Sequence, residues 1–194
     1  MLELGFLIVS LPILLITITL HEYSHAKAAD MMGDPTPRLA GRLTLNPIAH
    51  IDPIGLLALI LVRFGWAKPV PINPYNFKDP KRGSLLVSLA GPASNFLFAW
   101  ILAVLYRNLP IAYGDFGASI LTYTIWINLA LGVFNLIPVP PLDGSHILEY
   151  FLPPQQMEVM YRLQQYSLFI LIFIIAFGAP LIGTVIEFLY RLIM

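Results

Sequence analysis

An uncharged apolar run, Leu4–Leu20, constrains the fold of this chain more than any other feature. A bilayer core is about 30 Å thick, and a helix of roughly 20 apolar residues crosses it. Only 11% of the 194 residues are charged and 58% are hydrophobic, whereas soluble domains carry about 25% charged residues. So few charges cannot cover a water-facing surface. We therefore predict an all-α integral membrane protein whose solvent is the lipid bilayer.

Charge and cysteine content exclude several classes of site. The formal net charge is +0, which gives no electrostatic basis for binding nucleic acid. The chain has no cysteine, so disulfides and thiolate metal sites are excluded. The acidic start Met1-Leu2-Glu3 provides no basic region ahead of the first apolar run. We therefore expect this run to be a retained membrane segment and not a cleaved signal peptide.

Apolar runs separated by helix breakers predict a polytopic helical bundle with about 5–6 apolar helices. We expect a single membrane-embedded domain over residues 1–194. The long helices are predicted over residues 4–31, 84–106 and 118–136. Apolar sequence resumes near Met157 and runs to the end of the chain. Gly178-Ala179-Pro180 either divides this last run into two helices or kinks a single one.

Two shorter segments follow the first helix. Residues 54–62 are apolar but extend only about 14 Å as a helix, which predicts a re-entrant or interfacial piece that does not cross the membrane. Residues 38–45 alternate loosely between polar and apolar side chains, which predicts a short strand or a small β-hairpin. Such a segment either adds a strand to an extended substrate or has no role in substrate binding.

The distribution of basic residues predicts the orientation in the cell membrane. Eight of the eleven basic residues lie between Lys27 and Arg82. The positive-inside rule places residues 32–83 in the cytoplasm. The N-terminus is then outside, and the carboxyl end of the first helix is on the cytoplasmic side.

His21-Glu22-Tyr23-Ser24-His25 matches the pattern H-E-x-x-H. Residues four apart lie on one face of a helix, so His21 and His25 can direct two imidazoles at one metal ion. Glu22 is turned by about 100° from them, which suits a base acting on a water molecule that the metal activates. The spacing is that of zinc proteases, although it also occurs by chance in soluble helices. Two histidines and a glutamate near a membrane are costly without a use, which favours the zinc interpretation.

A catalytic zinc ion needs a third protein ligand, and the candidate is Asp143. It follows Ile137–Leu142, where three prolines exclude regular helix, and Gly144 permits a turn that presents the carboxylate. The alternative is an ordinary Asp-Gly turn after a helix. Two predicted crossings separate Asp143 from the histidines, provided that residues 54–62 do not span the membrane. The two stretches then lie on the same side.

Three other polar side chains have competing interpretations. His50, with Asp52, either supports the metal site or caps a loop, and the loop role is favoured. His146 is either an additional ligand or substrate contact or, as we favour, a surface histidine. Asn95 lies inside an apolar helix, where an interhelical hydrogen bond is favoured over substrate contact.

These motifs resemble the site-2 protease family of intramembrane zinc metalloproteases. His21, Glu22 and His25 match its first signature. The second signature, N-x-x-P-x-x-P-x-D-G, is matched by Asn135, Pro138, Pro141, Asp143 and Gly144. Gly91-Pro92-Ala93-Ser94-Asn95 is similar to a further G-P-x-x-N pattern of the family.

The resemblance implies that His21, His25 and Asp143 bind Zn²⁺ and that Glu22 is the general acid/base. It implies that Asn135 steadies the substrate carbonyl or the developing oxyanion. The implied substrates are membrane-spanning proteins or peptides, cut by regulated intramembrane proteolysis. We expect a compact branch of the family without the PDZ or cystathionine-synthase-like (CBS) domains of many relatives.

Two other functions remain open. The first is a non-catalytic membrane adaptor that keeps the fold, against which the intact set of metal-site residues argues. The second is a metal carrier, which would need ionisable residues strung across several helices. The interiors of the helices predicted over 84–106 and 118–136 carry no charges, so no such path is evident.

Overall fold

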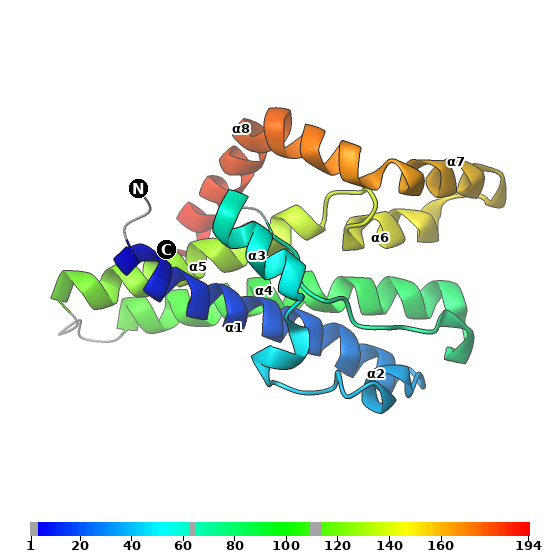
Figure 1. Cartoon of the computed structure of the whole chain (residues 1–194), viewed down its shortest axis with the longest axis horizontal. Helices are drawn as coiled ribbons and strands as arrows, with labels where there is room; N and C mark the ends of the chain where they lie inside the picture. Colours follow the sequence, from blue (N-terminus) through cyan, green and yellow to red (C-terminus); the bar gives the residue numbers. More distant parts are fainter. Residues whose placement is uncertain (1–3, 63–64, 109–113) are drawn as a thin grey trace. The chain divides into compact units, whose positions relative to one another are not determined.

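The structure is a computed structural model that describes residues 4–62, 65–108 and 114–194 (Figure 1). Its helices and 3-10 turns follow one another as α1 (Leu4–Met31), α2 (Thr36–Leu39), η1 (Pro47–His50), α3 (Pro53–Val62), η2 (Pro74–Asn76), α4 (Pro80–Asn108), α5 (Gly114–Asn135), α6 (Asp143–Phe151), α7 (Pro154–Gln165) and α8 (Ser167–Ile193). The all-α membrane class is confirmed. The chain divides into two compact units, Met1–Gly91 and Pro92–Met194, and each is described by itself.

Four helices in the described part of the chain are long and apolar enough to cross a membrane. They are Ile8–Met31 of α1, Pro80–Asn108 of α4, Phe116–Asn135 of α5 and Ser167–Ile193 of α8. This is fewer than the 5–6 apolar helices predicted. The helix α3, with 10 residues, is too short to span, as predicted, and the last apolar run contributes a single candidate span, α8.

The break in the carboxyl-terminal run lies earlier than the sequence suggested. Tyr166, with φ −105° and ψ 11°, separates α7 from α8. The helix α8 then continues through Gly178 and Pro180 without ending. Membrane helices tolerate such breakers because neighbouring groups satisfy the backbone that proline frees. The apolar sequence after Tyr166 is long enough to favour one continuous span.

The predicted strand or hairpin over residues 38–45 is wrong. Residues 38–39 are helical, and residues 40–45 form turns and irregular chain. Thr36–Leu39 forms the helix α2, and Pro37 lies in its first turn, where proline is tolerated. The chain then turns at Gly41, whose φ of +67° suits glycine. The described residues contain a single isolated β-bridge, between Ile51 and Ala67.

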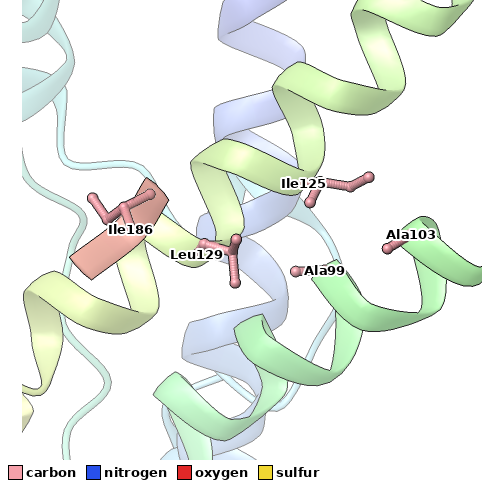
Figure 2. Packing of buried hydrophobic residues seen from close by; sticks show 5 residues of the cluster. All are labelled: Ala99, Ala103, Ile125, Leu129 and Ile186. Atoms are coloured by element: carbon pink, nitrogen blue, oxygen red, sulfur yellow. The ribbon is translucent and has the colours of Figure 1, made fainter. Parts of the chain in front are cut away.

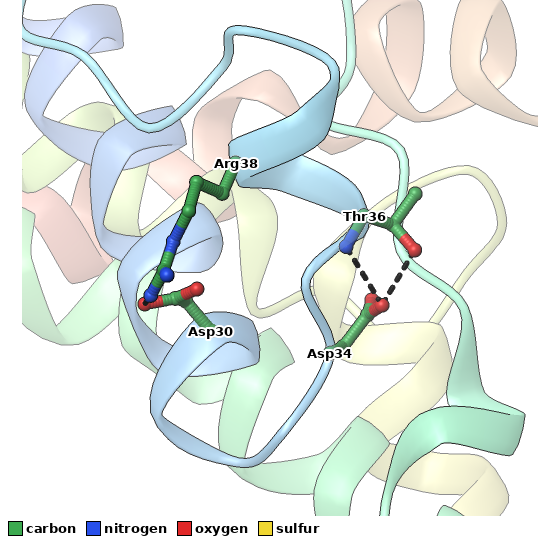
Figure 3. Close-up of polar contacts among 4 residues, drawn as sticks. All are labelled: Asp30, Asp34, Thr36 and Arg38. Atoms are coloured by element: carbon green, nitrogen blue, oxygen red, sulfur yellow. Dashed lines mark hydrogen bonds and ion pairs between the residues drawn. The ribbon is translucent and has the colours of Figure 1, made fainter.

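A buried carboxylate fixes the path of the chain after α1. Asp34 is fully buried and accepts hydrogen bonds from the backbone N–H and the hydroxyl of Thr36, as Figure 3 shows. It also accepts from the backbone N–H of Asn73 and the side-chain amide of Asn76, both at 2.7 Å. Burial alone raises the pKa of Asp34, but these hydrogen bonds outweigh it and the pKa is lowered. Asp34 thus ties the loop at 73–76 to the end of α1.

The second unit has its own apolar core. The core residues come from α4, α5 and α8 and include two alanines that let helices approach closely (Figure 2). They are Ala99, Ala103, Ile125, Leu129 and Ile186. Asn95 of α4, four residues before Ala99, is fully buried. Its side-chain amide donates to Asn128 of α5 at 3.1 Å. The interhelical hydrogen bond predicted for Asn95 is therefore confirmed.

Candidate metal centre

Two buried imidazoles meet on one face of α1. The Nε2 atoms of His21 and His25 lie 3.0 Å apart, and the rings are nearly perpendicular at 84°. The residues are only 5% and 6% exposed. Nitrogen ligands at about 2.05 Å from a tetrahedral zinc ion are roughly 3.3 Å apart. The spacing of the two nitrogens is therefore close to that of a zinc-binding pair.

A backbone carbonyl fixes the orientation of one imidazole. His25 Nδ1 lies 2.7 Å from the carbonyl oxygen of Val87 in α4. A carbonyl can only accept, so Nδ1 carries the proton and Nε2 keeps its lone pair for a metal. Histidine ligands in metal sites are held in the same way. The donor set on α1 therefore fits a metal ion such as zinc.

Gly91 provides the space around both rings. A Cβ atom at this position would lie 2.6 Å from Cε1 of His21 and of His25, and closer still to Nε2 of His25. Real Cβ atoms essentially never come within 3.0 Å of another group in this way. The absence of a side chain at residue 91 is therefore required for α4 to pass beside the imidazole pair.

The carboxylate of Glu22 is held by a loop of the same unit. Its Oε2 accepts a hydrogen bond of 3.1 Å from the backbone N–H of Val70. Arg42 is buried nearby, and its guanidinium donates to the carbonyl of Lys68. Burial lowers the pKa of Arg42, while the negative charge of Glu22 acts in the opposite direction. Glu22 thus has a fixed partner and a cation in its surroundings.

Asp143 is the first residue of α6, directly after the proline-rich turn that ends α5. Gly144 explains how α6 begins there, because a Cβ at this residue would lie 2.5 Å from the carbonyl carbon of Leu136. The hydroxyl and N–H of Ser145 both donate to the carbonyl of Leu142. The Asp-Gly pair therefore allows the start of α6 to pack against the end of α5 and fixes the backbone that carries the Asp143 carboxylate.

Asn135 ends α5, and its side-chain Nδ2 donates to the carbonyl of Leu131 at 3.0 Å. An amide nitrogen carries two hydrogens. This contact fixes the side chain and leaves one N–H for another acceptor.

The remaining histidines take the roles that the sequence favoured. His50 is buried, and its Nε2 lies 2.9 Å from the carbonyl of Thr44. Asp52 accepts from the N–H of Gly55 at the start of α3. His146 is half exposed and pairs with Glu149 at 3.0 Å on the surface of α6. His50 and Asp52 stabilise the loop, and His146 is a surface residue.

Three contacts at this centre were missed from the sequence. Val87 and Val70 act through backbone atoms, which leave no side-chain signature. Gly91 was noted only as part of a motif, without a role. The Pro-Val-Pro sequence around Val70 was a usable signal. Proline has no N–H, so Val70 is the one backbone donor of these three residues.

Comparison with known proteins agrees with this chemistry. The chain is 42% identical over 179 residues to YwhC of Bacillus subtilis, a protein named as a candidate zinc metalloprotease. The match covers 87% of this chain and 79% of that relative. The model of peptidase family M50 matches residues 111–178. The chain belongs to the site-2 protease family, peptidase family M50.

More distant relatives support the assignment. Rip2 of Mycobacterium tuberculosis, also named as a candidate zinc metalloprotease, is 32% identical over 174 residues. That match covers 86% of this chain and 65% of the relative, so the chain spans somewhat less than two thirds of the mycobacterial protein. The zinc metalloprotease MJ0392 of Methanocaldococcus jannaschii is 28% identical over 141 residues, 72% of this chain and 33% of the relative. No solved structure matches the chain.

Proposed function

We propose that this M50 member is an intramembrane zinc metalloendopeptidase that hydrolyses peptide bonds of membrane-spanning proteins or peptides. The observation that carries the proposal is the buried imidazole pair of His21 and His25, with Nε2 atoms 3.0 Å apart near the end of a membrane-length helix. The adjacent Glu22 carboxylate supplies the base that hydrolysis needs. Buried ionisable groups in a membrane protein mark its functional site.

In this proposal His21, His25 and Asp143 hold the zinc ion, as their match to the two family signatures implies. Two imidazole nitrogens and a carboxylate oxygen are common zinc ligands. Zinc in a site with three protein ligands polarises a carbonyl and supplies a water nucleophile at neutral pH. Met1–Gly91 and Pro92–Met194 would then act together as one metalloprotease domain.

Two other residues complete the proposed site. Glu22 transfers the proton, and Asn135 binds the substrate carbonyl. Glu22 accepts the proton of the attacking water and delivers it to the amine that leaves. The free N–H of the Asn135 amide donates to the carbonyl oxygen of the substrate as negative charge develops there. The carbonyls of a membrane-spanning substrate are satisfied within its helix, so the substrate unwinds locally before attack.

The proposed location is the cell membrane, with several crossings. By the positive-inside rule, the basic residues between Lys27 and Arg82 favour a cytoplasmic location for the loops of the first unit. The N-terminus is then outside, and the proteolytic site lies near the cytoplasmic side.

The Glu22→Gln variant tests the proposal. Purified wild-type and variant protein are compared in liposomes for zinc content and for cleavage of a membrane-spanning peptide. Glutamine keeps the shape of the side chain but cannot accept the proton. We expect the variant to retain its zinc ion and to lose cleavage by about 10²- to 10⁴-fold.

The same experiment separates the other functions. A wild-type protein that binds zinc without cutting any peptide supports the adaptor. Zinc that passes from outside to inside the liposomes supports the carrier. Equal cleavage by wild type and Glu22→Gln would remove Glu22 from the reaction.

A further inference from the structure

A short proline-flanked segment supplies the hydrogen bond that holds the Glu22 carboxylate. In Pro69-Val70-Pro71 only Val70 carries a backbone N–H, because proline has none. That N–H donates to Oε2 of Glu22 at 3.1 Å. A residue that precedes proline is confined to extended backbone. Val70 therefore presents its one donor from a backbone with little freedom to turn away.

The residues just before Pro69 are anchored to the loop after α1. Ala67 forms the β-bridge with Ile51, and the N–H of Lys68 donates to the carbonyl of His50 at 3.0 Å. The carbonyl of Lys68 accepts from the guanidinium of Arg42. These contacts fix the segment two residues before the donor to Glu22.

Burying the charged side chain of Arg42 costs more free energy than anchoring a loop would require. The residue is 4% exposed, and its Nε is buried without a hydrogen-bond partner among the described residues. A buried charge is expensive to desolvate unless its surroundings compensate it. A neutral donor would satisfy the Lys68 carbonyl at lower cost. The carbonyl of Lys68 that Arg42 binds lies two residues before the N–H that holds the Glu22 carboxylate, so the guanidinium fixes the segment that positions Glu22.

We propose that Arg42 and the backbone N–H of Val70 are positioning groups that hold the Glu22 carboxylate in place for proton transfer. This inference rests on the proposed proteolytic function. Neither group is among the proposed metal ligands, so both should affect the rate of the chemical step and leave zinc binding unchanged. No contact with substrate is invoked, so the KM should stay the same.

The test measures kcat, KM and zinc content for Val70→Pro, Arg42→Gln and Arg42→Lys with a membrane-spanning peptide. Val70→Pro removes the donor and extends an existing proline sequence. We expect kcat to fall about 10- to 100-fold for Val70→Pro and for Arg42→Gln. KM should stay within about twofold and zinc content should be unchanged. Arg42→Lys restores the charge and one donor, so it should recover part of the lost kcat.

Arg38→Gln is the matched control. It removes one positive charge four residues away, where the exposed side chain of Arg38 pairs with Asp30 at 2.6 Å. Figure 3 shows these two side chains meeting. Its kcat should equal that of the wild type. If Arg42→Gln does not yield folded protein, Val70→Pro and Arg42→Lys decide the question.

The outcomes distinguish this inference from the proposed function. Unchanged kcat in Val70→Pro and Arg42→Gln, with an inactive Glu22→Gln, would overturn the positioning role alone. A loss of zinc together with activity would also overturn it, because the two groups would then maintain the site and not the carboxylate. A wild-type protein without cleavage would refute the proposed function, and the positioning role with it.

Discussion

Replacing Gly91 by alanine should remove zinc without changing any ligand. The new Cβ would lie 2.6 Å from Cε1 of both His21 and His25, whereas ordinary contacts begin at 3.4 Å. Both Cε1 atoms would have to retreat by about 0.8 Å, and Nε2 of His25 by more, while zinc–ligand distances tolerate only about 0.2 Å. The His25 ring cannot retreat freely, because its Nδ1 is held 2.7 Å from the Val87 carbonyl. Displaced ligands should weaken zinc binding about 10- to 100-fold, which corresponds to roughly 1.4–2.7 kcal/mol.

Zinc content per chain, measured by mass spectrometry after titration with a chelator, reports this loss directly. Gly183→Ala is the matched control, since a Cβ at Gly183 in the membrane helix α8 has no atom within 4 Å. The control should bind zinc like the wild type. Wild-type zinc affinity in Gly91→Ala would refute the steric reasoning. Gel filtration and thermal unfolding of both variants show whether a loss of metal reflects the site or a loss of fold.

Two further predictions concern stability. Asp34→Ala should lower the free energy of unfolding by about 2–4 kcal/mol, because a buried charged acceptor of several hydrogen bonds is lost. The folded pKa of Asp34 lies below its usual value of 3.8. The stabilising effect of Asp34 is therefore complete above pH 3.8 and is lost as the pH falls through the folded pKa. The stability of Asp34→Asn should approach that of the wild type only in acid, and denaturation in detergent between pH 3 and pH 7 checks this. Asn95→Ala should cost about 0.6–2 kcal/mol through the lost bond to Asn128; no change in the melting temperature would contradict that role.

The helices and the imidazole pair were predictable because each depends on local sequence. Apolar runs of membrane length predicted α1, α4 and α5 to within a few residues. The spacing of His21 and His25 placed both rings on one face of α1. Three prolines predicted the irregular segment before Asp143.

The remaining features depend on contacts between segments distant in sequence. Arg38 and Leu39 alternate with their neighbours like a strand, yet the prolines near the start of α2 favour a helical turn. Gly178 and Pro180 look like a helix end but lie inside α8, since a membrane span tolerates them. The approach of Gly91 to the imidazoles requires a long-range helix contact that no local pattern encodes.

Zinc X-ray absorption, with the metal quantified per chain, tests most directly whether His21, His25 and Asp143 share one ion. The wild-type spectrum should fit two imidazoles and one carboxylate, and Asp143→Ala should lose most of its zinc. His146→Ala, three residues along α6 and exposed, should keep both its zinc and the wild-type spectrum. An Asp143→Ala protein that holds a full complement of zinc with an unaltered spectrum would contradict the account.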